Sequence, residues 1–157
     1  DGGIFAFGQA RFHGSTGGAR LSDPVVDIAA SPTGEGYTLV AADGGVFTFG
    51  DARFLGSTGD LVLNEPIVAV GVTGTGRGYW LVAADGGIFA YGDAFFSGST
   101  AEVDLASPIV AMAPTPSSRG YWLVSADGGV FAFGDAEFHG SAGDSRLNQP
   151  IVGFARR

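Results

Sequence analysis

Apolar residues occur along the whole chain in short runs that are closed by glycine, aspartate or serine. In the run at residues 78–84 (GYWLVAA), Tyr79 and Leu81 point to one side of an extended strand, and Trp80 and Val82 point to the other. Both sides are apolar, so a sheet that contains this strand must be covered on both faces. The pattern predicts an all-β fold in which small sheets pack against one another.

The same pattern repeats every 42 residues. Asp-Gly-Gly begins at Asp1, Asp43, Asp85 and Asp127 with no insertion or deletion between the copies, and the last copy is incomplete. Repeats of this length are typical of architectures in which each unit packs on its neighbours. We therefore interpret residues 1–157 as a single repeat domain, and we expect it to be a fragment of a longer array.

Each unit contains four candidate strands, which lie at residues 66–72, 78–84, 88–91 and 95–98 in the second and third copies. The Asp-Gly pair at Asp85 suits the tight turn of a hairpin, because glycine adopts positive φ without steric cost. In the last of these strands Phe12, Phe54, Phe96 and Phe138 are constant, whereas the next position is His13, Leu55, Ser97 or His139. One fixed face and one variable face indicate an outermost, partly exposed strand.

This arrangement predicts a β-propeller built from 42-residue, four-stranded antiparallel blades. In the first strand, Ile67 and Ala69 are expected on one face, and Val68 and Val70 on the other. A β-trefoil-like fold and a β-solenoid are alternatives, although a trefoil needs three units and solenoid rungs are usually shorter. The chain starts at a third strand and ends after a first strand (PIVGFAR), so a blade shared by both ends would lack its GYW strand.

The charge of the chain narrows the range of partners. The chain contains sixteen acidic residues and eight basic ones, all of the latter arginine, so the net charge is −8. This balance opposes binding to nucleic acid and to anionic lipid. No apolar run is long enough to span a membrane. The absence of lysine from a chain rich in alanine and glycine indicates a GC-rich genome, such as that of an actinobacterium.

The run from Gly120 to Ser141, in which GYWLV leads through Asp-Gly-Gly to His-Gly-Ser, resembles a tandem repeat of secreted and cell-surface actinobacterial proteins. The resemblance covers the whole chain, and it implies a propeller-like, extracellular, non-catalytic module. A weaker likeness relates residues 125–129 to the Asp-box of sialidase propellers. That box is a structural turn, so the likeness implies no sialidase activity.

Several polar residues are candidates for catalytic or metal-binding groups. The Asp-Gly-Gly carboxylates are expected instead to accept hydrogen bonds from the amides of their own turns, and so are Asp51, Asp93 and Asp135. His13 and His139 each precede Gly-Ser, but the two copies between them lack the histidine, and Gly-x-Ser-x-Gly does not occur. We therefore predict no enzymatic activity, no metal and no cofactor.

Ligand-binding residues are expected where the copies differ. The loops at residues 31–35, 73–77 and 115–119 share one rim, and Arg77 and Arg119 lie beside the GYW strands. Aromatic rings that could stack on a sugar are Tyr79, Trp80, Tyr121 and Trp122, with Tyr37 in the first copy, although their constancy and central strand position favour a place in the core.

The sequence thus predicts a non-catalytic binding or adhesion module at the cell surface or outside the cell. Its expected ligand is a neutral glycan or another cell-wall component, with a protein partner as a further option. The alternative function is a structural spacer or an assembly element. In that case the incomplete blade would form a homo-oligomer that completes the ring.

Overall fold

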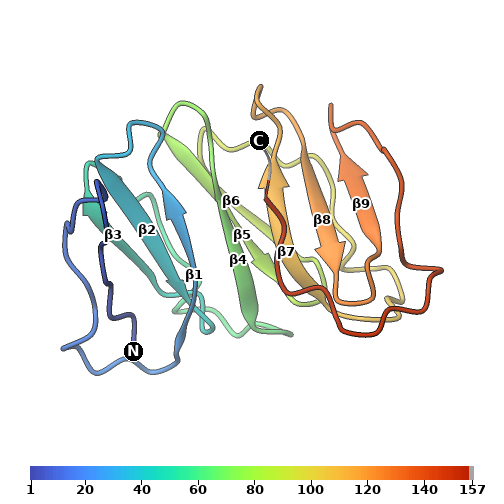
Figure 1. The fold of residues 1–157 in the computed structure, drawn as a ribbon, viewed down its shortest axis with the longest axis horizontal. Coiled ribbons are helices and arrows are strands. Elements are labelled where there is room, and N and C mark those ends of the chain that lie inside the picture. The colour runs from blue at the N-terminus through green and yellow to red at the C-terminus, as the bar shows by residue number, and fades with distance from the viewer. Residues whose placement is uncertain (156–157) are drawn as a thin grey trace.

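The computed structural model describes residues 1–155 and confirms an all-β fold. Nine strands form three separate antiparallel sheets that lie side by side in chain order (Figure 1). Sheet 1 contains β1 (Val25–Ala30), β2 (Gly36–Ala41) and β3 (Val46–Gly50). Sheet 2 contains β4 (Ile67–Val72), β5 (Gly78–Ala83) and β6 (Ile88–Gly92). Sheet 3 contains β7 (Ile109–Pro114), β8 (Tyr121–Ser125) and β9 (Val130–Phe133).

The Asp-Gly-Gly turns join the second and third strands of each sheet, so every sheet takes strands from two successive sequence copies. In each of the four turns the aspartate Oδ1 accepts a hydrogen bond from the amide two residues later, at 2.8–3.1 Å. This confirms the turn role predicted for Asp1, Asp43, Asp85 and Asp127. In the central copies Gly44 and Gly86 have positive φ, as such a turn requires.

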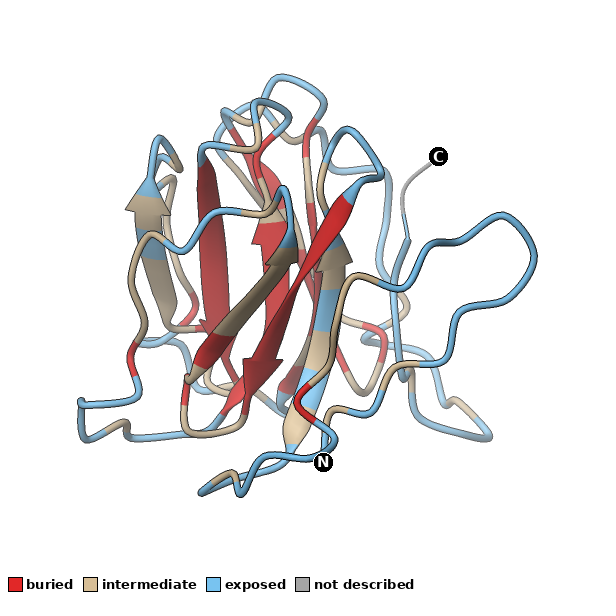
Figure 2. Cartoon of the chain, turned by 90° about the vertical axis from the view of Figure 1, so that its left-hand side faces the viewer, coloured by how far each residue is buried: buried red, intermediate tan, exposed pale blue. Residues whose placement is uncertain are grey.

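The core lies between neighbouring sheets, and the middle strand of each sheet supplies its centre (Figure 2). Tyr79 and Leu81 of β5 pack toward sheet 1 with Val40 and Val46. Trp80 and Val82 pack toward sheet 3, where Trp80 meets Tyr121 with ring centroids 5.7 Å apart. The predicted two-faced burial of this strand is therefore confirmed.

The first strand of each sheet differs from the predicted simple alternation. The pairing of β4 with β5 shifts between Ile67 and Ala69, which indicates a β-bulge at Val68. As a result, Ile67 and Val70 share the core facing sheet 1, whereas Val68 and Ala69 face sheet 3. The same shift occurs in β1 and β7. The prediction that paired Ile67 with Ala69 was therefore wrong, because the extra residue reverses the faces after it.

The predicted fourth strand at residues 95–98 is not a regular strand in the structure. Two side chains hold this segment instead of a ladder of backbone hydrogen bonds. The Trp80 Nε1–H donates to the Phe95 carbonyl oxygen at 2.9 Å, and the Tyr121 hydroxyl accepts the Ser97 amide at 3.1 Å and donates to the Gly98 carbonyl. Burial raises the pKa of the Tyr121 hydroxyl, which therefore stays protonated and available as a donor. We call residues 95–98 and their counterparts the outer segment of each copy.

The two ends of the described chain also lack the strands assigned to them from sequence. Residues 4–7 and 151–155 follow irregular paths, because neither segment has a second strand beside it. Phe5 and Phe7 are 84% and 82% exposed. Residue 156, the last residue of the predicted strand, and residue 157 lie outside the described residues. Within residues 1–155 no helix is long and apolar enough to cross a membrane.

Backbone hydrogen bonds tie each sheet to the next one at the rim that carries the Asp-Gly-Gly turns. The Ile67 amide, at the start of β4, donates to the Ala42 carbonyl oxygen at 2.9 Å. The Ile109 amide donates in the same way to Ala84, and the Ile151 amide to Ala126. Successive sheets are therefore held both by side-chain packing and by a recurring backbone link.

Asp27 forms a further link between sheets 1 and 2, and it replaces the alanine found at this position in the next two copies. Its Oδ2 accepts the Val70 amide of β4, and its Oδ1 accepts the Ile28 amide, both at 2.8 Å. Burial raises the pKa of this carboxyl, and the two amides offset only part of that effect. The folded protein therefore takes up a proton at Asp27 more readily than the unfolded chain does.

This raised pKa predicts a specific pH dependence of stability. Between the ordinary carboxyl pKa of 3.8 and the raised pKa, Asp27 is ionised in the unfolded chain but still protonated in the folded protein. Ionisation of Asp27 therefore lowers the free energy of unfolding progressively as pH rises. An Asp27→Asn variant lacks that ionisation, so its free energy of unfolding relative to the wild type should increase as pH rises above the ordinary carboxyl pKa of 3.8. Urea unfolding at several pH values measures this difference. A difference that stays constant with pH would contradict the account.

Candidate functional site

A cleft of about 460 Å³ opens between the loops of sheets 2 and 3, at the rim opposite the Asp-Gly-Gly turns. It lies between the loop that joins β4 to β5 and the loop that joins β7 to β8, two of the loops predicted to bind ligand. The turn after β6 closes one side of it. The residues that line the cleft are Thr73, Thr75, Asp93, Phe95, Ser117, Ser118 and Arg119.

Asp93 fixes the shape of the loop on one side of the cleft. Its Oδ1 accepts the Thr73 hydroxyl at 2.9 Å, and its Oδ2 accepts the Thr75 hydroxyl at 2.6 Å. The same two hydroxyls accept the Gly78 and Arg77 amides, both at 3.1 Å. Asp93 thus bonds to hydroxyls of a neighbouring loop rather than to amides of its own turn, which corrects the role predicted from sequence.

Asp51 and Asp135 are also corrected, because they bind loop hydroxyls in the same way. Asp51 accepts the Thr33 hydroxyl at 2.5 Å, and Asp135 accepts the hydroxyls of Ser117 and Thr115. These bonds lower the pKa of both carboxyls, chiefly through Thr33 and Ser117. The carboxylates therefore remain ionised, and they keep the loops on this rim in a fixed conformation.

Ser118 has an unusual backbone conformation for its residue type. Its φ is +58°, in the left-handed region, and it is the one non-glycine residue with positive φ within residues 1–155. Gly34 and Gly76 occupy the equivalent positions, with φ of +76° and +66°. The Ser118 hydroxyl accepts the Gly74 amide at 2.9 Å and so connects the two loops of the cleft. A side chain is thus present here despite the backbone strain, which often marks a functional position.

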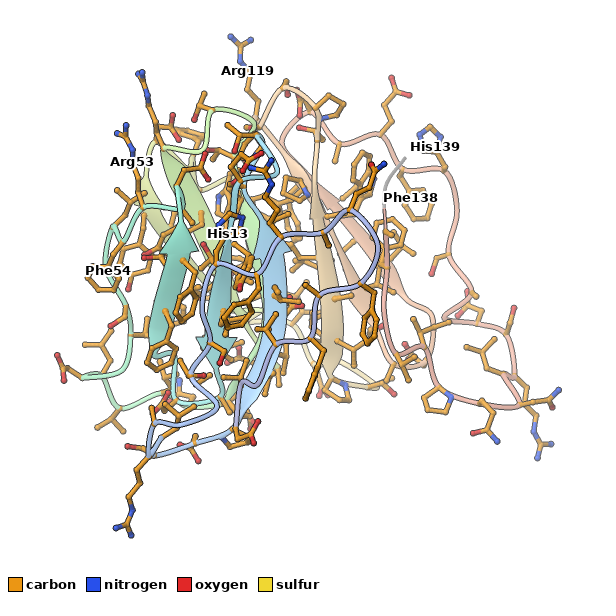
Figure 3. All side chains as sticks on the ribbon, turned by 60° about the vertical axis from the view of Figure 1, so that its left-hand side comes forward. His13, Arg53, Phe54, Arg119, Phe138 and His139 are labelled. Atoms are coloured by element: carbon orange, nitrogen blue, oxygen red, sulfur yellow. The ribbon has the colours of Figure 1, made fainter. Side chains whose placement is uncertain are left out.

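Phe95 and Arg119 are the two largest exposed side chains that line the cleft. Phe95 is 68% exposed, although its carbonyl is fixed by Trp80. Arg119 lies at the loop rim and extends away from the sheets (Figure 3). Arg77, the other arginine predicted to bind ligand, is exposed on the preceding loop but does not line the cleft. The structure therefore brings only Arg119 of this pair to the site.

Of the aromatic residues considered as sugar platforms, all but Trp122 are buried in the core, as their central strand position predicted. Tyr79, Trp80 and Tyr121 are at most 2% exposed, so their rings belong to the core between sheets and do not form a ligand surface. Tyr37 is also buried. Trp122 is partly exposed and borders a separate hollow of about 320 Å³, together with Val130, His139, Gly140 and Phe154.

The two histidines belong to different outer segments and different environments (Figure 3). His13 is partly buried against Tyr37, with ring centroids 5.9 Å apart, whereas His139 is exposed and lies 3.9 Å from Glu137. The part of the chain that the structure describes contains no group of three histidine, cysteine or acidic residues placed to hold a metal ion. The two histidines therefore do not share one site.

Sequence reasoning missed Asp93 and Phe95 as cleft residues. Phe95 occupies a position where the other copies have Arg11, Arg53 and Glu137, so it meets the criterion of difference between copies that identified the loops. Ser118 meets the same criterion, because glycine stands in the other loops. For Asp93 no such signal exists, since Asp51 and Asp135 are its equivalents and only tertiary packing places it beside the next sheet.

The fold belongs to the all-β, propeller-like class. The chain is similar to the structure described as U3-55K, with a TM-score of 0.57 and 9% sequence identity over 85% of this chain and 43% of that one. It is also similar to the WD40 repeats of RRP9, with a TM-score of 0.53 and 8% identity over 85% of this chain and 42% of that one. The chain spans less than half the length of these structures, and at such identity the likeness concerns the fold alone. No protein-family model and no curated protein sequence matches the chain.

Proposed function

We propose that this chain is a non-catalytic binding module that holds a unit of a neutral glycan in the cleft between sheets 2 and 3. The observation that carries the proposal is the composition of the cleft, where an exposed phenylalanine, an arginine, a carboxylate and four hydroxyls line one hollow. The C–H face of a pyranose packs on an aromatic ring, and its hydroxyls exchange hydrogen bonds with charged and polar side chains. A net charge of −8 favours a neutral ligand over an anionic one.

The same chemistry argues against glycoside hydrolysis at this site. Hydrolysis ordinarily requires two carboxyl groups on opposite sides of the scissile bond. Asp93 is the single carboxylate that lines the cleft, and both of its oxygens accept hydrogen bonds from threonine hydroxyls. Asp93 therefore serves to position the loop, and binding without turnover is the activity we propose.

In this proposal the three sheets act as blades of a β-propeller. The module would work outside the cell or at the cell surface, as its resemblance to actinobacterial repeats implies. The cell wall supplies neutral glycan there. A second candidate function, an assembly element, is favoured by Val26 and Ile28, which are 42% and 50% exposed on β1. Concentration-dependent mass in solution would support that alternative, whereas an unchanging monomer mass would contradict it.

Binding to isolated bacterial cell walls, cellulose and chitin tests the proposed function. The wild-type chain should be retained at high salt and released by soluble oligosaccharide. Phe95→Ala and Arg119→Ala should each weaken retention about tenfold, the effect of losing one interaction worth about 1.4 kcal/mol. Arg77→Ala is the matched control, because this arginine occupies the equivalent loop position outside the cleft, and it should leave retention unchanged.

Ser118→Gly is an informative additional variant. It relieves the left-handed strain while removing the hydroxyl that joins the two loops, so we expect weaker binding without a loss of thermal stability. Equal retention of the Arg119 and Arg77 variants, or release of the wild type by salt alone, would contradict the proposed function.

A further inference from the structure

A repeated phenylalanine stands out on the surface of the outer segments. Its four copies, Phe12, Phe54, Phe96 and Phe138, are 58%, 60%, 53% and 61% exposed. The residues that follow three of them, His13, Leu55 and Ser97, are partly buried and differ from one another. The exposed phenylalanine is therefore the same in all four copies, whereas the more buried residue after it differs between copies. Packing within the fold does not explain this constancy.

The exposure of these rings is a property of the stacked sheets themselves. Phe54 lies in the outer segment between sheets 1 and 2, and Phe96 lies in the one between sheets 2 and 3. Both flanking sheets are present in each case, yet both rings remain more than half exposed. Figure 3 shows Phe54 on the outer edge of its sheet, with Phe138 on the outer segment of another.

The backbone on which these rings stand is held firmly. Immediately after Phe54, the Leu55 amide donates to the Tyr79 hydroxyl at 3.0 Å, and the Tyr79 hydroxyl donates to the Gly56 carbonyl. Phe96 is held on both sides, by the Trp80 bond to the Phe95 carbonyl and by the Tyr121 bond to the Ser97 amide. A ring on a fixed backbone loses little conformational entropy when it binds a ligand.

The residues on either side of these rings indicate the kind of partner. Polar or charged positions flank most of them, such as Arg53 beside Phe54, and Glu137 and His139 beside Phe138. A lipid surface or an apolar protein partner requires a continuous apolar patch of several hundred Å². A polysaccharide instead presents small apolar ring faces separated by hydroxyl groups.

We propose that the constant phenylalanines form a row of stacking platforms along which an extended neutral polysaccharide binds across several sheets. The inference deepens the proposed function, since it concerns the same class of ligand, but it uses different residues from the cleft. The cleft would bind one sugar unit, and the row would add weak contacts with the same polymer. Several weak contacts on one polymer raise its overall affinity, whereas a short oligosaccharide gains nothing from them.

The test compares polymer with oligosaccharide. Phe54→Ala/Phe96→Ala should reduce retention on cellulose or chitin at least tenfold and leave the binding of soluble cello- or chito-oligosaccharides unchanged. Phe54→Trp/Phe96→Trp should retain polymer binding, because the ring rather than the exact side chain is required. Phe7→Ala is the control, since this ring is 82% exposed but lies outside the row, and it should behave as the wild type. Thermal unfolding verifies that the variants fold.

The outcomes separate this inference from the proposed function. Suppose that oligosaccharide binding depends on Arg119 and that the double alanine variant still retains polymer normally. This result would contradict polymer binding by the row of phenylalanines and would support ligand binding in the cleft. Polymer retention that depends on the phenylalanines and not on Arg119 would support polymer binding by the row and would contradict ligand binding in the cleft. Binding of the wild type to phosphatidylcholine vesicles through Phe54 and Phe96, or to none of these saccharides, would overturn the row.

Discussion

Replacing Trp80 with alanine is expected to lower the free energy of unfolding by about 3–5 kcal/mol. Trp80 is fully buried between sheets 2 and 3, where it packs with Tyr121 and Met112. The change would remove this packing and also the hydrogen bond that holds the Phe95 carbonyl. Because a single domain is stable by only about 5–15 kcal/mol, the loss should be obvious in urea or guanidinium unfolding.

Trp122→Ala is the matched control for this prediction. Trp122 makes the equivalent hydrogen bond, from its Nε1–H to the Glu137 carbonyl at 2.8 Å, but it is only partly buried. The two variants therefore differ mainly in the packing that is lost, and Trp122→Ala should cost less than half as much. Equal losses would show that the hydrogen bond, rather than packing between sheets, supplies most of the stabilisation.

Replacing Gly86 with alanine is expected to be comparably harmful, at about 2–4 kcal/mol. Gly86 has φ of +80°, and a Cβ atom there would lie 1.8 Å from the hydroxyl oxygen of Thr100, which is itself buried. Two costs therefore combine, namely backbone strain and a steric clash. Unfolding by denaturant, monitored by circular dichroism, measures their sum.

Two further variants separate these costs. Gly34 has a nearly equal φ of +76°, and a Cβ atom added there would have no neighbour within 4 Å, so Gly34→Ala should show only the backbone strain, about 1 kcal/mol. Adding Thr100→Ala to Gly86→Ala should restore part of the loss, because Ala142 is the natural neighbour of Gly128 in the fourth copy. Failure of this second change to restore any stability would contradict the steric explanation.

The sequence predicted the repeat, the Asp-Gly-Gly turns and the two buried faces of β5, because each depends on local residue order. The bulge at Val68 was not predictable in this way. Residues 67–70 are all apolar, so the hydrophobic pattern is the same whether or not the strand slips by one residue. The pairing with β5 decides the faces, and that pairing is a property of the folded sheet.

The outer segment and the cleft show a similar limit. The segment Phe-Phe-Ser-Gly at residues 95–98 is compatible with a short strand, but the side chains that hold it, Trp80 and Tyr121, lie 15 and 24 positions away in the sequence. Two of the rim loops singled out from differences between the copies, together with Arg119, do line the cleft. The positions of Asp93 and Phe95 in the cleft depend on how sheet 2 packs against sheet 3, and no local sequence pattern indicates this packing.

The offset between sequence copy and sheet has a consequence for how such arrays grow. Each sheet closes across an Asp-Gly-Gly turn, with two strands from one copy and the third from the next, and Ile67 is bonded to Ala42 of the preceding sheet. Duplication of any 42-residue stretch, wherever its breakpoints fall, would therefore insert one whole sheet with its links intact. The number of copies encoded by such a gene can therefore change without disturbing the strand register. Single differences between copies, such as Ser118, give individual loops their own chemistry.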